Sequence, residues 1–535
     1  MSDPIPGSSI DRAVVARAGR VRTARRRRQP RSLRASPLPA VSLALLRAVL
    51  LSSPLLSSVV VAGCSAPESG DGPSLAGAAS GYNVVIVSVD TLRADRLGAW
   101  GYMTRETSPE MDRLVTSGVR FAQASAPRAL TWPSLATMLT GLYPSGHGLL
   151  YNGYLLDDAQ PTLPLILKQA GYETAAFLAN MCKANHQGWD QFDCAGGVDR
   201  RVNREAIAWL RQRQPDRPFL LWVHYFGPHS PYYAGGDLAR TQLDPGYEGE
   251  LLPKKGVLDR VMTGPIPLDD ADRRHLDAIY DAAVIGTDRW IGELHDVLEQ
   301  EIGLERTVIV FLADHGEDLY QHHDYLYHAC SVYETSLHVP LAMIAPTLLP
   351  AGAVHEGVVE MVDLLPTLLD LLGLQDPSCL HGETLRPLLE RAAAPGGVQP
   401  GGAQPGGVRR PVGGAPAGGG SAFTEYGASE VFTFREGDWK LVVNPTGKAP
   451  ICMEGVAEGF YPIDERELYD LSVDPTEQTD LSKVRPERLG QLEAAITVRR
   501  KALCGARPAE RQSLDEETQR ELEALGYVTK DESDE

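Results

Sequence analysis

Two common sequence features are missing from this chain of 535 residues. None of its seven cysteines forms a Cys-x-x-Cys pair, which argues against a zinc ribbon and against a thioredoxin-like redox site. Beyond the uncharged stretch 48–63 there is no further long apolar run, so the sequence offers no second membrane contact. Charged residues make up 23% of the chain and hydrophobic residues 43%, and this ordinary balance excludes wholesale disorder.

Basic charge is scarce outside the N-terminal segment, and lysine is missing within it. Residues 1–63 contain eleven arginines and two acids, Asp3 and Asp11, so their net charge is +9. Since the whole chain carries −19, the remaining residues carry −28. A body this acidic repels phosphate backbones. The charge distribution therefore excludes a nucleic acid as the expected partner.

The basic N-terminal segment has the pattern of an export signal. The arginine run 25–28 precedes the uncharged stretch 48–63, and a Val-Ala-Gly-Cys sequence ends at Cys64. That ending resembles a bacterial lipobox, in which Cys64 becomes the lipidated first residue. The alternative is an uncleaved anchor, for which sixteen uncharged residues interrupted by Pro54 are short. We predict an exported bacterial lipoprotein, periplasmic or on the cell surface, whose lipid or anchor is its membrane contact.

Six cysteines remain if Cys64 is lipidated, and an exported protein encounters an oxidising compartment. Cys182 and Cys194 are close enough in sequence to bridge a loop, and Cys452 with Cys504 is a second candidate pair. The pairing itself cannot be read from the spacing.

Composition divides the chain into six predicted parts. In order they are a signal peptide, a flexible tether, a catalytic α/β domain, a Gly/Pro-rich insertion or linker, a C-terminal subdomain and an acidic tail: 1–63, 64–82, 83–391, 392–420, 421–507 and 508–535.

Apolar β-branched runs alternate with helical patterns in the third part. Runs typical of buried parallel strands lie at 84–89, 174–178, 219–225 and 307–312. Helical patterns lie at 110–117, 134–139, 162–170, 204–213 and 269–299. The alternation predicts an α/β domain with a mostly parallel sheet flanked by helices. Short strands expected at 422–426, 431–435, 439–444 and 467–471 predict a smaller α+β subdomain.

Acidic side chains follow two of the predicted strands. Asp90 comes directly after the first strand, and Asp314 with His315 follows the strand 307–312. The carboxyl ends of strands in such sheets carry catalytic groups. Two carboxylates and an imidazole suit one divalent cation, namely Ca²⁺, Mn²⁺ or Mg²⁺, with Zn²⁺ as an alternative. A single Asp at a strand end is more often a helix cap, so the prediction depends on the combination.

Thr131 lies just before a predicted helix that begins with Pro133 and Ser134. The exposed N–H groups and the dipole of a helix N-terminus favour an anion. Beside a cation, which lowers the pKa of a hydroxyl group, Thr131 is a candidate nucleophile. The simpler alternative is that Thr131 only caps the helix.

Several further motifs occur in a fixed order. They are Val-Asp-Thr-Leu-Arg-Ala-Asp at 89–95, Pro-Ser to Thr-Gly-Leu-Tyr-Pro at 133–144, Gly-His-Gly at 146–148, His-Tyr-Phe-Gly-Pro-His-Ser-Pro-Tyr at 224–232, Ala-Asp-His-Gly-Glu at 313–317, the segments 333–341 and 362–369, and Leu-Tyr-Asp-Leu with Asp-Pro at 468–475. Together they resemble the sulfatase branch of the alkaline phosphatase superfamily. The resemblance implies an alkaline-phosphatase-like fold and an ester hydrolase.

The chain departs from the sulfatase pattern at its nucleophile and at its anion contacts. Thr131 stands where formylglycine-type sulfatases have Cys or Ser, Leu135 stands where they have Arg, and no cysteine begins a Cys-x-Pro-x-Arg motif. The formylglycine mechanism is therefore excluded. The family's Gly-Lys-Trp-His segment is replaced at 178–181 by Leu-Ala-Asn-Met. The remaining pattern is similar to threonine-dependent, single-metal relatives such as lipoteichoic acid synthases and some phosphodiesterases.

The resemblance to these relatives also assigns roles. Asp90, Thr131, Asp314 and His315 are the expected metal ligands, and Thr131 is the expected nucleophile. His229 is expected to bind a substrate oxygen or to protonate the leaving group. Two more catalytic candidates, His147 and His328, are less firmly placed.

These expectations define a metal-dependent hydrolase of sulfate or phosphate/phosphonate esters. Its substrate is predicted to be an anionic ester of a glycan, a lipid or a small molecule. One alternative is a transferase of the lipoteichoic acid synthase type, which moves a phospho-headgroup to an alcohol. The other is an inactive sulfatase-like binding protein. The sequence leaves the oligomeric state open.

Overall fold

The computed structural model describes residues 74–180, 186–232, 242–243, 245–249, 251, 268–323, 325–329, 331–394, 420–426, 431–448 and 462–504. The expected signal 1–63 and acidic tail 508–535 lie outside these ranges, as do nearly all of the Gly/Pro-rich segment and the first part of the tether. Among the described helices, none combines the length and the apolar character that crossing a membrane requires.

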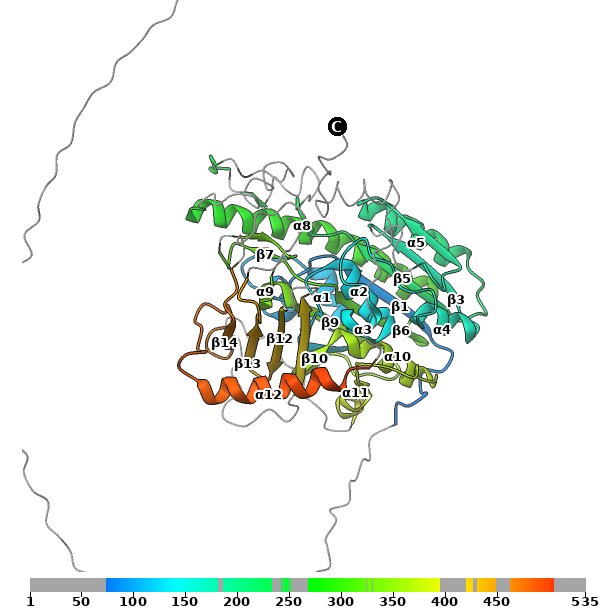
Figure 1. Cartoon of the computed structure of the whole chain (residues 1–535). Helices are drawn as coiled ribbons and strands as arrows, with labels where there is room; N and C mark the ends of the chain where they lie inside the picture. Colours follow the sequence, from blue (N-terminus) through cyan, green and yellow to red (C-terminus); the bar gives the residue numbers. More distant parts are fainter. Residues whose placement is uncertain are drawn as a thin grey trace, which may run out of the picture. The chain divides into compact units, whose positions relative to one another are not determined.

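An eight-stranded sheet forms the centre of the main domain (Figure 1). Its order is β10 (Ala353–Glu360), β2 (Val119–Ser125), β9 (His338–Ile344), β6 (Thr307–Ala313), β1 (Asn83–Val89), β5 (Phe219–Tyr225), β3 (Glu173–Leu178) and β4 (Gln191–Cys194). All neighbours pair in parallel, except that β9 is antiparallel to both β2 and β6. The strands β5 and β6 are buried along their whole length, which explains their uninterrupted apolar sequences. The predicted α/β class with a mostly parallel sheet is confirmed.

Helices cover the sheet in two groups (Figure 1). In one group, α1 (Pro109–Val115) and α5 (Asp199–Gln212) pack against the long helix α8 (Asp270–Val297). In the other, α2 (Thr131–Thr140) contacts α3 (Pro144–His147), α4 (Leu163–Gln169) and α10 (Leu364–Leu372), and α10 contacts α11 (Arg386–Ala393). The start of α8 is set by Asp269, whose side chain accepts hydrogen bonds from the N–H groups of Ala271 and Asp272.

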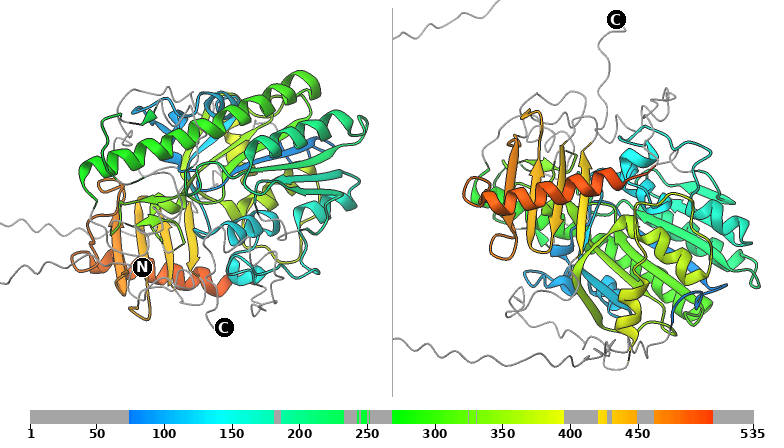
Figure 2. Two further views of the ribbon diagram at one scale, coloured as in Figure 1. Left: turned by 90° about the horizontal axis from the view of Figure 1, so that it is seen from above. Right: turned by 60° about the horizontal axis from the view of Figure 1, so that its bottom comes forward.

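A second, antiparallel sheet forms the C-terminal subdomain. Its strands follow the order β11 (Ser421–Tyr426), β12 (Val431–Glu436), β13 (Trp439–Val443) and β14 (Arg466–Asp470). The helix α12 (Pro486–Ala502) runs across β12 and β13, as Figure 2 shows, and buries Leu492 and Ile496 against them. A hydrogen bond of 2.7 Å from the Phe423 N–H to Glu360 Oε1 links this sheet to the end of β10. The smaller C-terminal α+β subdomain is thus present.

Four charged side chains, which we call the junction cluster, connect the two sheets. They are Glu334 on the short helix α9 (Glu334–Leu337), Arg435 on β12, Lys440 on β13 and Glu477. Lys440 Nζ lies 2.9 Å from Glu334 Oε1 and 2.7 Å from Glu477 Oε1. Arg435 Nη1 lies 2.5 Å from Glu334 Oε2. Only 1% of the Lys440 side chain is exposed, so its charge is neutralised inside the protein.

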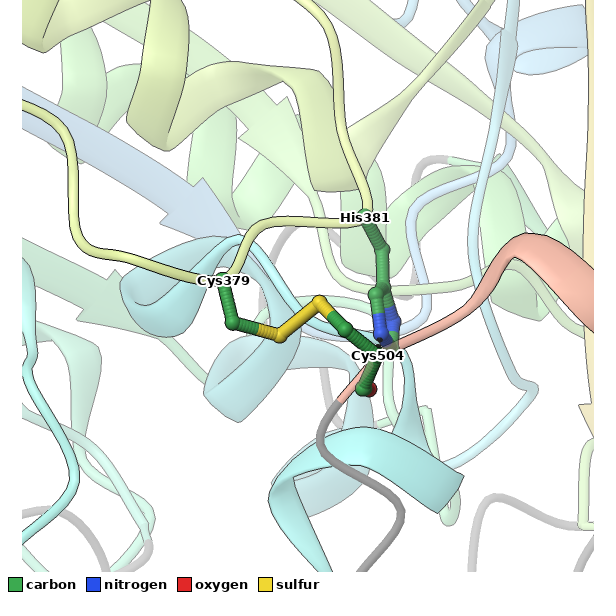
Figure 3. A group of neighbouring side chains, drawn as sticks. All are labelled: Cys379, His381 and Cys504. Atoms are coloured by element: carbon green, nitrogen blue, oxygen red, sulfur yellow. Dashed lines mark hydrogen bonds between the residues drawn. A yellow bond between two sulfur atoms is a disulfide. The ribbon is translucent and has the colours of Figure 1, made fainter.

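The disulfide of Cys504 differs from the expected pairing. Cys504 bonds to Cys379, 125 residues away in sequence, so the candidate bridge from Cys504 to Cys452 is wrong (Figure 3). Cys194 is also disulfide-bonded, whereas Cys182 and Cys452 lie outside the described residues. His381 lies beside the Cys379–Cys504 bond, but both sulfur atoms are consumed by that bond, so this trio is not a metal site.

The packed part of the chain begins ahead of Asn83, where the sequence places the domain boundary. Leu75 and Ala79 are buried, and the N–H groups of Gly77 and Ala79 donate to the carbonyl oxygens of Asp370 and Leu371 in α10. Residues 74–82 therefore lie along α10 as part of the domain.

Candidate active site

Three neighbouring strands carry the candidate site at their carboxyl ends. In the parallel register, Val89 at the end of β1 pairs with Ala313 at the end of β6 and with Tyr225 at the end of β5. The next residues along β1 and β6 are Asp90 and Asp314, which therefore emerge side by side from the same edge. The parallel register explains why two acids far apart in the sequence meet.

Asp314 and His315 are held in fixed orientations by backbone groups. The N–H groups of Thr91 and His315 donate to Asp314 Oδ1 at 3.1 and 2.8 Å. His315 Nδ1 lies 2.9 Å from the carbonyl oxygen of Gly316, which can only accept, so Nδ1 carries the hydrogen. The lone pair of neutral His315 is then on Nε2, which lies 3.4 Å from Asp314 Oδ2 and 3.8 Å from Asp90 Oδ1.

Gly316 allows this turn to approach α9 closely. A Cβ atom at that position would overlap the carbonyl oxygen of Thr335. The glycine of the Asp-His-Gly sequence is thus required by packing, because any side chain would push the Asp314 turn away from α9.

Thr131 is the first residue of α2, and Leu130 occupies the N-cap position. The sequence placed Thr131 just before the helix and left open a role as a simple cap; the structure assigns the cap to its neighbour. The Thr131 hydroxyl lies 3.4 Å from His315 Nε2, and the residue is 1% exposed. The four predicted metal-site residues, Asp90, Thr131, Asp314 and His315, therefore come together.

Five buried polar atoms around this edge have no hydrogen-bond partner among the described residues. They are Asp90 Oδ1, Thr91 Oγ1, Asn180 Oδ1, His224 Nε2 and Asp314 Oδ2. Such atoms are rare in native proteins, where buried polar groups are almost always paired. Atoms that coordinate one cation at about 2.0–2.4 Å lie about 3–4 Å from each other, as the His315 contacts do. The unpartnered atoms of Asp90, His224 and Asp314, residues whose donor atoms lie within 4.8 Å of one another, therefore fit a bound divalent cation.

The charge at this edge also favours a cation. Burial, followed by the neighbouring Asp314 carboxylate, raises the pKa of Asp90 well above its usual range. A hydrogen bond of 2.7 Å from Asn180 Nδ2 to Asp90 Oδ2 opposes this shift. Among the described residues, no Lys or Arg pairs with Asp90 or Asp314, so this part of the chain does not supply the balancing charge.

His224 joins this group, although it is not among the site residues expected from the sequence. One donor atom each of Asp90, His224 and Asp314 lies within 4.8 Å of the others, and all three residues are buried. We call Asp90, His224, Asp314 and His315 the cation cluster. The sequence signal that could have identified His224 is a polar residue near the end of an otherwise apolar strand. Side chains of β5 alternate between the two faces of the sheet, and β5 pairs with β1.

Two of the predicted catalytic histidines line up beside His315. The His328 ring centroid lies 4.3 Å from that of His315, and the His229 centroid lies 5.2 Å from that of His328. His328 Nδ1 is 3.2 Å from Glu317 Oε1, and His229 Nδ1 is 2.7 Å from the carbonyl oxygen of Ser230. Burial, followed by the two neighbouring imidazoles, lowers the pKa of His328 well below its usual range, so this ring is neutral at pH 7.

His147 has different neighbours. Its Nε2 lies 3.1 Å from Thr137 Oγ1 in the second turn of α2, and its Nδ1 accepts the Leu149 N–H at 3.1 Å. Burial lowers the pKa of His147 to about 3. Both ring nitrogens thus bind helix α2 and the following turn, and a direct role in catalysis stays a prediction.

Comparisons with known proteins agree with the fold and with the motifs. The family model described as Sulfatase matches residues 82–374, and the chain belongs to this family. The N-acetylglucosamine-6-O-sulfatase of Bacteroides thetaiotaomicron is 23% identical over 489 residues, covering 75% of this chain and 82% of that protein.

Two solved structures share the fold. A protein bound to its substrate D-glucosamine-2-N,6-O-disulfate superposes with a TM-score of 0.61 at 21% identity, covering 81% of this chain and all of the other. The phosphonate monoester hydrolase of Agrobacterium radiobacter superposes with a TM-score of 0.59 at 22% identity, covering 79% of this chain and 96% of the other. The protein is a hydrolase of sulfate or phosphate esters, and its family generally uses a divalent metal.

Proposed function

We propose that this protein hydrolyses an anionic ester with Thr131 as its nucleophile and one divalent cation as its cofactor. The observation that carries the proposal is the position of the Thr131 hydroxyl, which lies at the N-terminus of α2 and 3.4 Å from His315 Nε2. A helix N-terminus favours the anionic group of the substrate, and the cation cluster lies against the hydroxyl.

Asp90, Asp314, His315 and Thr131 would hold the cation. When bound, it supplies positive charge that lowers the pKa of the threonine hydroxyl and polarises a substrate oxygen. The chain's own contribution is geometric, because the backbone N–H groups on Asp314 and the carbonyl oxygen of Gly316 hold two of these side chains in place.

The reaction would proceed in two displacements. The Thr131 hydroxyl gives its proton to solvent water, and its oxygen bonds to sulfur or phosphorus, while the bond from that atom to the ester oxygen breaks and the electron pair leaves with this oxygen. His229, beside the neutral ring of His328, would pass a proton to the departing alcohol. Water then attacks the same sulfur or phosphorus, which frees Thr131 and releases the inorganic or phosphonic acid.

The substrates to test first follow from the similar proteins. Sulfated amino sugars are named for one relative and for one solved structure, and phosphonate monoesters for another. The stretch 178–181 lacks the lysine and the histidine that the family pattern has there. We therefore infer a site that relies on the cation and on α2, more than on basic side chains, to hold the anion.

The test uses the full mature protein loaded with Mn²⁺, Ca²⁺, Mg²⁺ or Zn²⁺ and assayed on aryl sulfate, phosphate monoester, phosphodiester and phosphonate ester substrates. Thr131→Ala should lower kcat by at least about a thousandfold, as loss of a nucleophile does in other hydrolases. Thr140→Ala is the matched control, because Thr140 is also buried in α2 and bonds only within that helix and the following turn.

Full turnover in Thr131→Ala would disprove the nucleophile assignment. Mass spectrometry of the wild-type protein after a rapid acid quench should reveal a sulfated or phosphorylated Thr131. Preferential transfer to an added alcohol, in place of water, would instead support the transferase alternative.

We also propose that the protein is exported and carries a lipid on Cys64, on the basis of the basic segment, the apolar segment and the Val-Ala-Gly-Cys ending alone. These residues lie outside the described part of the chain. Labelling of expressing cells with an alkyne fatty acid should mark the wild-type protein and leave Cys64→Ala unlabelled. Equal labelling of both would disprove lipidation at this position.

A further inference from the structure

His224 is a buried imidazole whose inner nitrogen faces two carboxylates. It is the next-to-last residue of β5, it pairs with Ser88 on β1, and none of it is exposed. Its Nε2 lies 3.9 Å from Asp90 Oδ2, which is too long for a hydrogen bond, and Nε2 has no other partner among the described residues. Asp90 Oδ2 already accepts the Asn180 amide at 2.7 Å.

The outer nitrogen of His224 belongs to a chain of hydrogen bonds that starts at an indole. Trp222 Nε1, which can only donate, donates to Ser88 Oγ at 2.8 Å. Ser88 Oγ lies 2.9 Å from His224 Nδ1. A hydroxyl oxygen has two lone pairs, so Ser88 can accept both N–H groups. In that arrangement the hydrogen of neutral His224 is on Nδ1, and its lone pair on Nε2 points toward the carboxylates.

This arrangement matches that of a metal-binding histidine. Such residues almost always donate their second ring N–H to an oxygen partner, which fixes the ring and its tautomer. The distance of 3.9 Å between Nε2 and Asp90 Oδ2 lies in the range of two atoms that share one ion. A cation would also partner the buried Nε2, which is otherwise left without one.

We propose that His224 is a ligand of the catalytic cation, held in place by Ser88 and Trp222. The proposal rests on the proposed function, since it concerns the same ion. It changes the predicted donor set from one imidazole to two, alongside the carboxylates of Asp90 and Asp314. Imidazole nitrogen suits zinc, iron, cobalt and copper, whereas magnesium and calcium prefer oxygen. The site then selects a transition-metal ion over Ca²⁺ and Mg²⁺.

Metal affinity, measured by titration calorimetry on the metal-free full mature protein, is the first test. We expect Zn²⁺ and Co²⁺ to bind at least about tenfold more tightly than Ca²⁺ and Mg²⁺. His224→Asn should weaken Co²⁺ at least about tenfold and change Ca²⁺ little. Ser88→Ala, which keeps His224 but removes its acceptor, should weaken Co²⁺ about 10–100-fold. His355→Asn is the matched control, because His355 lies on β10 at the opposite side of the sheet.

The number of imidazole groups bound to the metal can be counted without an activity assay. This count distinguishes a wrong ligand assignment for His224 from a wrong proposed function. Pulsed electron paramagnetic resonance of the Cu²⁺-loaded protein should detect two histidine nitrogens in the wild type and one in His224→Asn, with both proteins folded by circular dichroism. One nitrogen in both would overturn the proposal and make His224 an N–H donor to Asp90, while the proposed function stands. No cation binding in the wild type would overturn the proposed function as well. If the wild type shows only one nitrogen but still turns over substrate, and Thr131→Ala is inactive, then the assignment of His224 as a ligand is wrong and the proposed function stands.

Discussion

Two clusters of buried acids in this molecule have opposite electrostatic situations. In the junction cluster, Lys440 and Arg435 contact the carboxylates at 2.5–2.9 Å. In the cation cluster, no described Lys or Arg pairs with either carboxylate. The acids of both clusters are largely buried, Glu334 being the most exposed at 13% of its side chain, so burial alone does not distinguish a structural site from a functional one. What differs between the two clusters is whether a Lys or Arg from the described part of the chain pairs with the acids.

The pKa values of the acids follow this difference. Burial raises the pKa of any carboxyl group, and for Asp90 the Asp314 carboxylate adds to that effect. For Glu334, Lys440 and Arg435 together outweigh burial and lower the pKa to about 2. Glu477 has Lys440 beside it but not Arg435, and burial leaves its pKa raised. The neighbouring Glu334 carboxylate also raises the pKa of Glu477, so Lys440 alone does not offset its burial.

The largest expected effect comes from neutralising one acid in each cluster. Asp90→Asn should abolish cation binding and lower kcat/KM at least about a thousandfold. The metal-free variant should unfold at the same denaturant concentration as the metal-free wild type or at a higher one, since a buried charge is removed. Glu334→Gln should keep the cation affinity but lose about 3–5 kcal/mol of unfolding free energy. Calorimetry, kinetics and urea unfolding test both variants. Equal stability losses in both would mean that the two clusters do not differ as argued.

The next largest effect concerns the cation of the junction cluster. Lys440→Met leaves Glu334 and Glu477 buried without their shared partner, and should reduce the free energy of unfolding by about 3–5 kcal/mol. The control is Lys168→Met, because Lys168 lies 2.7 Å from Asp190 at the surface, with 45% of its side chain exposed. That exposed pair should contribute less than about 1 kcal/mol. Similar losses in the two variants would contradict the role assigned to the junction cluster.

The smallest expected effect is in the pH dependence of stability. Because the folded pKa of Glu334 is lowered, its contribution is present above pH 4.5 and disappears as the pH falls toward 2. Asp90 has a raised folded pKa, so its contribution is present below pH 3.8 and disappears as the pH rises through that folded pKa. Urea unfolding with a chelator present, from pH 2.5 to 7, should show Glu334→Gln flattening the acid limb and Asp90→Asn flattening the neutral limb. An unchanged acid limb in Glu334→Gln would refute the assigned shift.

Much of the fold could be predicted because its central strands have a recognisable local sequence pattern. The central strands are buried on both faces, so they are uninterrupted apolar runs, and the predicted limits of β1, β3, β5 and β6 agree with the structure to within one residue. The other four strands of this sheet, β2, β4, β9 and β10, were not predicted. β2 alternates polar with apolar residues, and β9 contains both His338 and Pro340, so neither has that simple pattern.

Local sequence also placed most of the candidate site. Asp90, Asp314 and His315 directly follow strands, and Thr131 lies where an apolar helix begins, so each could be named from its neighbours along the chain. His224 could not, because its role depends on Ser88 and Asp90, which lie on the adjacent strand. The Cys379–Cys504 bond was not predicted for the same reason, since Cys379 lies between α10 and α11 whereas Cys504 follows α12, 125 residues later.

The sequence by itself determined the α/β class, the family resemblance and the absence of a formylglycine motif, because these depend on residue type, order and spacing. Tertiary structure decided which buried acids pair with a Lys or Arg of the described part of the chain. Lys440 and Arg435 reach Glu334 only because β12 and β13 pack beside α9. Asp90 and Asp314 lack such a neighbour among the described residues, and strand register alone brings them together. Charge balance in the interior is a property of three-dimensional proximity, which composition does not record.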